Sequence, residues 1–306
     1  MENRKYHGKV ILFGEYSMIF GSEALLIPYE TVFGEWSSVI NRPSERAFES
    51  NRSLAKFYNY LIENDRFRIL DLKRFEMELN AGLFFDSNIP LGYGVGSSGA
   101  LVAATYERYK LIDIEDVTSL KEFFAAMENC FHSNSSGIDP LQCYIGKPFV
   151  LRQQTTNDRR QISFTTLDSN FISDNIHIFL IDTKIKSHTA PLVQHFKDLR
   201  NDKIYLNKFE NEYVPLVSKC INSLIEKNDD VFFTDLYELS LLQTDLLSHT
   251  IPNATKEFFL TNVKEDGFQV KLCGAGGGGF LLGFSNDIEK TNQYLECRGK
   301  KISWIK

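Results

Sequence analysis

A glycine-rich stretch from Pro90 to Ala100 has the residue types of a phosphate-binding loop. It reads Pro-Leu-Gly-Tyr-Gly-Val-Gly-Ser-Ser-Gly-Ala, and an apolar run follows directly. Glycines let successive backbone N–H groups point into one concavity, and a helix that starts there adds the positive end of its dipole. The two serine hydroxyls could bind phosphate or a phosphate-bound Mg²⁺ ion. The candidate binding residues are Gly92, Gly94, Val95, Gly96, Ser97, Ser98 and Gly99.

This loop differs from two familiar nucleotide-binding patterns. A Walker P-loop ends in Gly-Lys-Ser or Gly-Lys-Thr, which the stretch lacks. A dinucleotide fingerprint needs Gly-x-Gly-x-x-Gly after a long strand, with an acidic residue about twenty positions on, and this pattern is also missing. Taken alone, the stretch could also be a glycine-rich turn that binds no ligand.

Two further stretches combine glycine with reactive side chains. Cys273 to Phe280 reads Cys-Gly-Ala-Gly-Gly-Gly-Gly-Phe between two apolar runs. A tight hairpin needs only two loop residues, so this longer loop indicates close packing against a ligand or another loop, with a flexible hairpin tip as the alternative. Near the N-terminus, Gly8-Lys9 and Gly14-Glu15-Tyr16 flank the apolar run Val-Ile-Leu-Phe. A lone lysine or glutamate is usually a surface residue.

Taken in order, these stretches resemble the motifs of the GHMP kinase superfamily, and most closely those of its mevalonate kinase branch. Gly8–Glu15 matches the first motif, Pro90–Ala100 the second, and Lys271–Gly279 the third. A fourth stretch, Glu128–Asp139, resembles the mevalonate kinase pattern Glu-x-x-x-His-Gly-x-Pro-Ser-Gly-x-Asp. Residues Asp182–Val193 resemble the branch's Thr-Lys…Ser-Thr-x-x-Leu-Val pattern.

The resemblance implies a role for each matching residue. Asp139 would act as the base or orienting group for the substrate hydroxyl, and Lys9 would pair with it and lower the pKa of that hydroxyl. Ser98 and Glu128 would hold Mg²⁺ between the β- and γ-phosphates of ATP. The backbone amides of residues 94–99 would cradle the phosphates.

For the acceptor, the resemblance points to Glu15, Tyr16 and Thr189, with Gly276 and Gly277 of the third motif flanking the nucleotide and the acceptor. Tyr16 stands where the family usually has histidine. A phenol can still donate a hydrogen bond, but it is larger than imidazole. The acceptor could therefore be mevalonate, a relative such as phosphomevalonate, or another small hydroxy acid or sugar.

The activity that the resemblance implies is phosphoryl transfer from ATP, with Mg²⁺, to a hydroxyl group. Mevalonate is the leading acceptor, and its product, 5-phosphomevalonate, serves isoprenoid precursor synthesis. Alternatives are a phosphomevalonate or sugar kinase, or a non-catalytic relative that senses a nucleotide or metabolite. Such a sensor should have lost its base or metal ligands, yet Lys9, Ser98, Glu128 and Asp139 are all present. This favours an enzyme. The chain could also form a homodimer, as relatives commonly do.

The bulk composition excludes several classes of partner. The 306 residues are 43% hydrophobic and 24% charged, with a net charge of −6. No dense cluster of Lys and Arg predicts a nucleic-acid surface, and no run reaches the roughly 18–20 apolar residues of a membrane span. The five cysteines are dispersed, and the N-terminal residues lack the apolar core of a signal peptide. We expect a cytoplasmic protein with reduced thiols.

Apolar patterns predict the elements that must position these residues. Strands are expected at 10–13, at 24–27 (stopped by Pro28), and at 31–40, 75–79, 149–151, 162–167, 176–181, 268–272, 280–284 and 303–305, with a polar loop at 153–160. Helices are expected at 53–64, 101–109, 120–131 and within 191–247. The pattern indicates an α+β fold. The resemblance further implies two domains: residues 1–165, of the ribosomal S5 domain 2-like type and binding nucleotide, and residues 166–306, ferredoxin-like, with the active site in the cleft between them.

Overall fold

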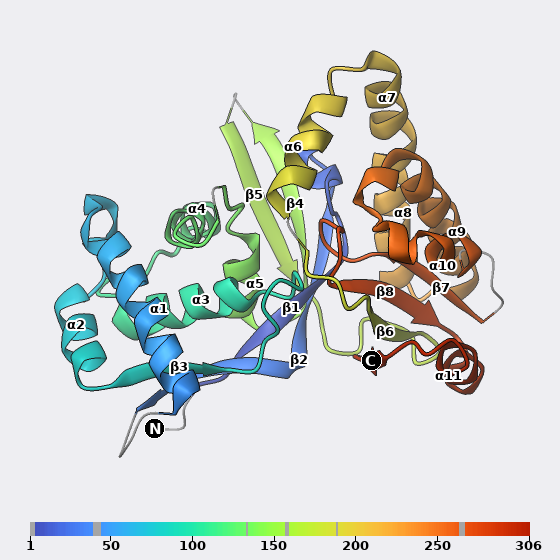
Figure 1. Ribbon diagram of the computed structural model, residues 1–306. Coiled ribbons are helices and arrows are strands. Elements are labelled where there is room, and N and C mark those ends of the chain that lie inside the picture. Colours follow the sequence, from blue (N-terminus) through green and yellow to red (C-terminus); the bar gives the residue numbers. More distant parts are fainter. Residues whose placement is uncertain (1–3, 39–43, 133, 157–158, 188, 263–266) are drawn as a thin grey trace. The chain divides into compact units, whose positions relative to one another are not determined.

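A computed structural model describes residues 4–38, 44–132, 134–156, 159–187, 189–262 and 267–306 (Figure 1). The chain forms two compact units. The first unit comprises Met1–Lys9, Pro28–Pro90 and Val95–Gly146. The second unit comprises Val10–Ile27, Leu91–Gly94 and Lys147–Lys306. Each unit is thus built from separated stretches of chain, and the predicted domain boundary at residue 165 stays a prediction.

The larger sheet has the strand order β1-β2-β4-β5, with β3 also paired to β2. Its strands are β1 (Tyr6–Phe13), β2 (Ala24–Ser38), β3 (Leu83–Ser87), β4 (Phe149–Thr156) and β5 (Arg159–Thr166). Pro28 was expected to end a strand, but β2 continues through it. Pro28 lies between the residues that pair with β4 (24–26) and those that pair with β3 (34–38), so its missing N–H interrupts neither ladder.

Most of the stretch expected as a polar loop at 153–160 lies in two paired strands instead, and its residues 157 and 158 lie outside the described residues. Within the described residues, β4 and β5 pair from Phe149↔Thr166 as far as Thr156↔Arg159. Each strand satisfies the backbone groups of the other, and this does not depend on apolar side chains. Polarity therefore misled the prediction at this point.

Five helices belong to the first unit: α1 (Glu45–Ile62), α2 (Leu72–Asn80), α3 (Ser97–Tyr109), α4 (Val117–Glu128) and α5 (Ile138–Ile145), together with the short 3₁₀ turn η2 (Asp65–Phe67). The prediction of a strand at 75–79 was wrong, because these residues lie in α2. Asp71 caps this helix by accepting the N–H of Arg74 (3.0 Å). Phe75 and Leu79 are buried one turn apart, while Met77 is 56% exposed.

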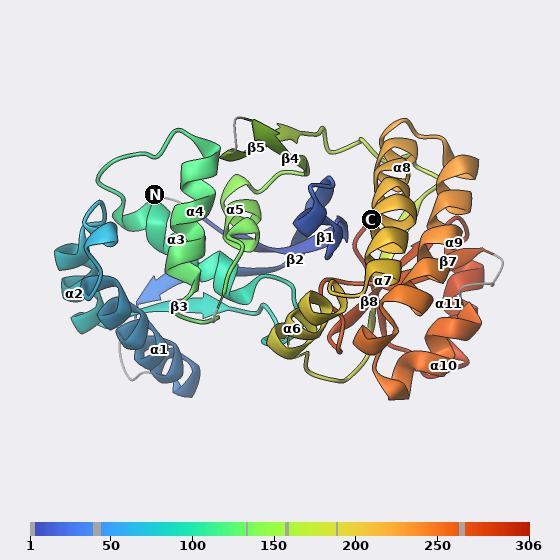
Figure 2. The same ribbon diagram turned by 90° about the horizontal axis from the view of Figure 1, so that it is seen from above.

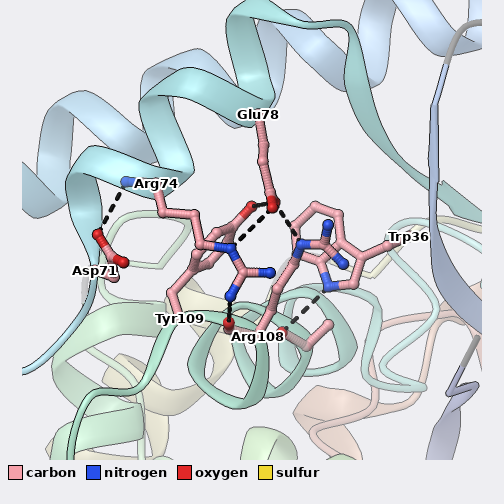
Figure 3. Close-up of polar contacts among 7 residues, drawn as sticks. Trp36, Asp71, Arg74, Glu78, Arg108 and Tyr109 are labelled. Carbon is pink, nitrogen blue, oxygen red and sulfur yellow. Dashed lines mark hydrogen bonds and ion pairs between the residues drawn. The ribbon is translucent and has the colours of Figure 1, made fainter. Parts of the chain in front are cut away.

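A polar cluster fixes the C-terminal end of α3 against α2 (Figure 3). One carboxylate oxygen of Glu78 accepts from Nε of Arg74 (2.9 Å), and the other accepts from Nε of Arg108 (2.7 Å) and the hydroxyl of Tyr109 (2.8 Å). The indole N–H of Trp36 donates to the Ala104 carbonyl in the middle of α3 (3.3 Å). The helix that follows the glycine loop is thereby anchored at its far end.

The second unit contains a four-stranded antiparallel sheet in the order β7-β8-β6-β9. The strands are β6 (His177–Asp182), β7 (Phe268–Leu272), β8 (Phe280–Ser285) and β9 (Ile302–Trp304), close to their predicted positions. Residues 178–181 of β6 are buried, as expected for an inner strand. The loop between β7 and β8 is the third glycine motif.

The helices of the second unit follow one another between β6 and β7, apart from α11 and the turn η1. They are η1 (Ser17–Phe20), α6 (Thr189–Leu199), α7 (Lys203–Lys208), the π-helical turn η3 (Phe209–Tyr213), α8 (Val214–Ile225), α9 (Asp229–Leu246), η4 (Ser248–Thr250), α10 (Asn253–Asn262) and α11 (Ile288–Glu296). Helices α8 and α9 lie side by side in Figures 1 and 2, and both α9 and α10 contact β7. Among the described residues, no helix has the length and apolar character needed to cross a membrane.

Candidate functional site

A buried lysine and a half-buried aspartate form an ion pair in the first unit. Lys9 lies on β1 with only 3% of its surface exposed. Its Nζ is 2.9 Å from Oδ1 of Asp139, which sits in the first turn of α5. The backbone N–H of Lys9 also donates to the carbonyl of Val95 (3.0 Å). One residue thus joins β1, the glycine loop and α5.

Two glycines of the loop allow this close approach. Gly96 has φ +85°, and a Cβ there would lie 2.9 Å from Cγ of Lys9. A Cβ at Gly99 would lie 2.8 Å from the carbonyl carbon of Asp139. Gly99 stands where the GHMP pattern has alanine, and the missing methyl lets α3 pack directly onto the start of α5. Larger residues at either position would push the loop away from the ion pair.

Positive φ angles alternate along the glycine loop. Gly92, Gly94 and Gly96 all have positive φ, and the intervening Tyr93 and Val95 do not. Alternation of this kind is typical of anion-binding nests, in which successive N–H groups turn toward one side. Helix α3 begins at Ser97, with no side-chain cap in the described structure. Gly92 and Gly94 belong to the second unit and residues 95–99 to the first.

Next to the ion pair in the first unit lies a buried carboxylate. Glu128, the last residue of α4, is 3% exposed and accepts a hydrogen bond from Oγ of Ser98 (2.7 Å). Its other oxygen accepts from Oγ of Ser135. Burial, and then the charge of Asp139, raise the pKa of Glu128 to about 7, against the opposing effect of these hydroxyls and Lys9. Nε2 of His132 lies 3.0 Å from Oγ of Ser98.

The donor set of Ser98 and Glu128 fits a magnesium ion. A carboxylate and a hydroxyl are the hard oxygen ligands that Mg²⁺ prefers. The raised pKa shows that the Glu128 charge is poorly compensated, so a cation would favour its ionised form. Among the described residues, no group of three or more His, Cys, Asp or Glu side chains could form a metal cage. Mg²⁺ often takes only one or two protein ligands, with phosphates and waters completing its shell.

The expected acceptor residues lie in the second unit. Glu15 and Tyr16 form the turn between β1 and η1. Oε1 of Glu15 accepts from Nζ of Lys271 (2.5 Å), and the hydroxyl of Tyr16 donates to the Ala275 carbonyl (2.8 Å). Burial, with Glu15 next in effect, raises the pKa of Tyr16 far above its usual range. Thr189 is the exposed first residue of α6.

Neighbouring segments hold the third glycine loop at several points. Oγ of Ser187 donates to the Gly276 carbonyl (2.5 Å), and the N–H of Gly277 donates to the Thr250 carbonyl (2.6 Å). Oγ1 of Thr183 donates to the Gly279 carbonyl (2.7 Å). The loop is therefore a fixed structure rather than the flexible hairpin tip that the sequence left open.

Sequence reasoning gave no role to several residues that contact the expected site. Lys271 begins the third motif, and a lysine within the apolar run Phe-Gln-Val-Lys-Leu is a usable signal of a buried charge. In the fourth motif, His132 matches the histidine of the mevalonate kinase pattern, and Ser135 stands where that pattern has proline. Their contacts with Glu128 and Ser98 depend on the turn after α4, which local patterns do not reveal.

Comparisons with known proteins agree with the motifs. The family model described as GHMP kinases N terminal domain matches residues 57–147, which include the second motif, Glu128 and Asp139. A mevalonate kinase from Archaeoglobus fulgidus is 24% identical over 295 residues, covering 94% of this chain and 94% of that protein.

Solved structures share the fold over nearly the whole chain. One is an L. major mevalonate kinase in complex with R-mevalonate (TM-score 0.66, 17% identity, 97% of this chain and 92% of that one). Another is a Streptococcus pneumoniae phosphomevalonate kinase in complex with phosphomevalonate and AMPPNP (TM-score 0.67, 14% identity, 99% and 100%). Both comparisons thus show that the chain is similar to GHMP kinases, in agreement with the order of its motifs.

Proposed function

We propose that this chain is an ATP- and Mg²⁺-dependent kinase that phosphorylates a hydroxyl group of a small acid, with mevalonate as the leading acceptor and 5-phosphomevalonate as the product. The observation that carries the proposal is the Lys9–Asp139 ion pair, formed in the same unit as the Ser98–Glu128 hydrogen bond. Phosphoryl transfer needs a group that orients the acceptor hydroxyl and oxygen ligands for the metal, and the two pairs supply these in turn. The similarity to a named mevalonate kinase supports the choice of acceptor.

In this mechanism Asp139 orients the acceptor hydroxyl and takes its proton as the phosphoryl group is transferred. A free hydroxyl has a pKa far above 7, so it needs a base or a strong local field. The ammonium group of Lys9, 2.9 Å from Oδ1 of Asp139, orients this carboxylate and stabilises negative charge on the acceptor oxygen.

The phosphates of ATP bind to the backbone amides of the glycine loop and to the start of α3. Positive φ at Gly92, Gly94 and Gly96 supports this assignment, because it gives the amides of an anion nest. Ser98 and Glu128 would hold Mg²⁺, which would supply positive charge that neutralises the transferred group.

Phosphomevalonate is a second candidate acceptor. The Tyr16 hydroxyl donates its single proton to the Ala275 carbonyl, so toward a substrate it can only accept a hydrogen bond and cannot donate one to a carboxylate or phosphate. Lys184 and Lys186 are exposed in the segment that holds the third glycine loop, and two ammonium groups would suit an additional phosphate.

A coupled ADP-release assay tests the proposal. The purified chain is given Mg-ATP and, separately, mevalonate, phosphomevalonate, galactose and homoserine. We expect turnover of mevalonate, a loss of about 10²-fold or more in Asp139→Asn, and no change in Asp168→Asn, whose carboxylate is exposed.

If a different acceptor is turned over, the chain is still a kinase, but mevalonate is not its substrate. If ATP binds but no acceptor reacts, the chain is a sensor rather than an enzyme.

A further inference from the structure

Lys271 is a fully buried cation that the proposed mechanism does not use. It lies on β7, and none of its surface is exposed. Its Nζ donates to Oε1 of Glu15 (2.5 Å) and to the carbonyl of Leu272 (2.6 Å), and it lies 5.3 Å from the ring centroid of Phe13. Burial of an ammonium group is unfavourable, and an apolar pair of similar volume is often at least as stable as a buried ion pair. Stability alone therefore does not account for this lysine.

The two hydrogen bonds of Lys271 fix the chain where the third glycine loop begins. The carbonyl of Leu272 accepts from Lys271, and its N–H donates to Oε1 of Gln243 (2.9 Å). Gln243 is itself oriented by the hydroxyl of Tyr213 (3.0 Å). The N–H and the carbonyl of Leu272 are thus both hydrogen-bonded to buried side chains, directly before the loop that starts at Cys273.

The turn that carries Glu15 holds the same loop at a second point. Tyr16 follows Glu15 with φ +53°, a conformation that costs a non-glycine residue free energy. Its hydroxyl donates to the Ala275 carbonyl, and its ring lies 4.6 Å from that of Phe196. Glycine would remove the strain but lose both contacts. We call Glu15, Tyr16, Lys271 and Ala275 the clasp.

We infer that Lys271 is a positioning residue for the acceptor, which acts through Glu15 by holding the turn at 14–17 and the loop at 274–279 in one arrangement. This inference rests on the proposed function, because Glu15 and the loop are placed on the acceptor side of the reaction. Without Lys271, acceptor binding weakens while the ATP phosphates keep their contacts with residues 94–99.

The test is a double-mutant cycle on steady-state constants. We expect Lys271→Gln to raise KM for the acceptor about tenfold and to leave KM for ATP unchanged. In a Glu15→Gln background, the same substitution should add less than about twofold, because its effect passes through Glu15. If Lys271 has a purely structural role, its substitution lowers the fraction of active protein but changes neither the KM for the acceptor nor the KM for ATP. Unchanged KM values, or effects that multiply in the double variant, would overturn the inference.

A milder variant keeps the test usable if Lys271→Gln does not fold. Tyr16→Phe removes only the hydroxyl bond to Ala275 and should raise KM for the acceptor in the same direction. Tyr60→Phe is the matched control, because Tyr60 makes an equivalent bond to the Ala126 carbonyl (2.8 Å) in the first unit. If the KM for the acceptor is the same in the wild type, Tyr16→Phe and Tyr60→Phe, the inferred role of the clasp is wrong.

Hydrogen exchange separates this inference from the proposed function. If the wild-type chain turns over no acceptor, the proposed function fails, but the clasp still predicts faster amide exchange in residues 273–280 of Tyr16→Phe than of Tyr60→Phe. Unchanged exchange there would overturn the clasp even in an active kinase.

Discussion

Lys9 lies at a buried position where a lysine is usually unfavourable. The residue is almost fully buried, and its partner Asp139 keeps 31% of its side chain exposed. Burial of a cation beside a solvated carboxylate adds little to stability, but it creates a strong local field. The pair is therefore better suited to stabilising charge on a reacting oxygen than to holding the fold together.

Lys9→Met should separate these two roles. We expect kcat to fall by about 10²-fold or more, because the developing negative charge loses its nearest cation. The melting temperature should change little, because water can solvate Asp139. Initial rates and thermal unfolding measure both effects, with Lys56→Met, an exposed position on α1, as the control. If kcat is unchanged in Lys9→Met, Lys9 has no part in the mechanism.

Glu128 gives the protein a pH-dependent stability that magnesium should reverse. Its ordinary pKa is 4.5, and in the folded protein it is about 7. Between these values the folded chain keeps a proton that the unfolded chain has lost, so stability falls as pH rises through this window. The decrease is complete above pH 7 and is on the order of 3 kcal/mol.

Urea unfolding at pH 5 and pH 8 in EDTA measures this decrease. Glu128→Gln should lack it and should be the more stable protein at pH 8, since an amide cannot ionise. Added Mg²⁺ should stabilise the wild type more than the variant at pH 8. The same pH slope in both proteins would show that Glu128 is already ionised at neutral pH in the folded state.

At the scale of elements, α3 is held at both ends by different interactions. Its N-terminal end packs on α5 through Gly99, and its C-terminal end is tied to α2 through Glu78 (Figure 3). Burial opposes ionisation of Glu78, but hydrogen bonds from Arg108, Tyr109 and Arg74 outweigh it and lower its pKa. The ionised carboxylate is thus the form that stabilises the helix pair.

Glu78→Gln should destabilise the protein by about 1–3 kcal/mol at pH 7. A lowered pKa contributes stability above the ordinary value of 4.5, and this contribution is lost as pH falls through the folded value. The difference between wild type and variant should therefore shrink below about pH 4. Chemical denaturation across pH measures it, with the exposed Glu49→Gln on α1 as the control. A constant difference at every pH would exclude the charge as the cause.

The prediction of helices and strands was correct where the apolar pattern of the sequence matches the buried residues, and wrong where the two differ. The strand β6 and the helix α3 lie near their predicted positions because their apolar runs are buried. Residues 75–79 alternate apolar and polar, yet Met77 faces solvent and the helical pair Phe75 and Leu79 faces the core. The sequence is thus compatible with both the two-residue period of a strand and the 3.6-residue period of a helix, and packing against the core selects the helix.

At the scale of the whole molecule, the net charge of −6 gives no general attraction for ATP. The proposed binding of ATP must therefore depend on local features, for which we propose the amides of the glycine loop and the start of α3. The motifs and their order could be identified from the sequence through a family resemblance. The contact between Glu15 and Lys271 could not, because no local pattern relates residues so far apart.

The separation between these two residues also affects how the chain is made. Glu15 and Lys271 are 256 positions apart, and β2 pairs with β4 through residues more than a hundred positions downstream. Contacts of such range form slowly. A nascent chain therefore carries the turn at Glu15 without its counter-ion until the ribosome has added residue 271. We expect residues 10–27 to be a binding site for a chaperone during synthesis, since they leave the ribosome early and their partners in β4 and at Lys271 follow much later.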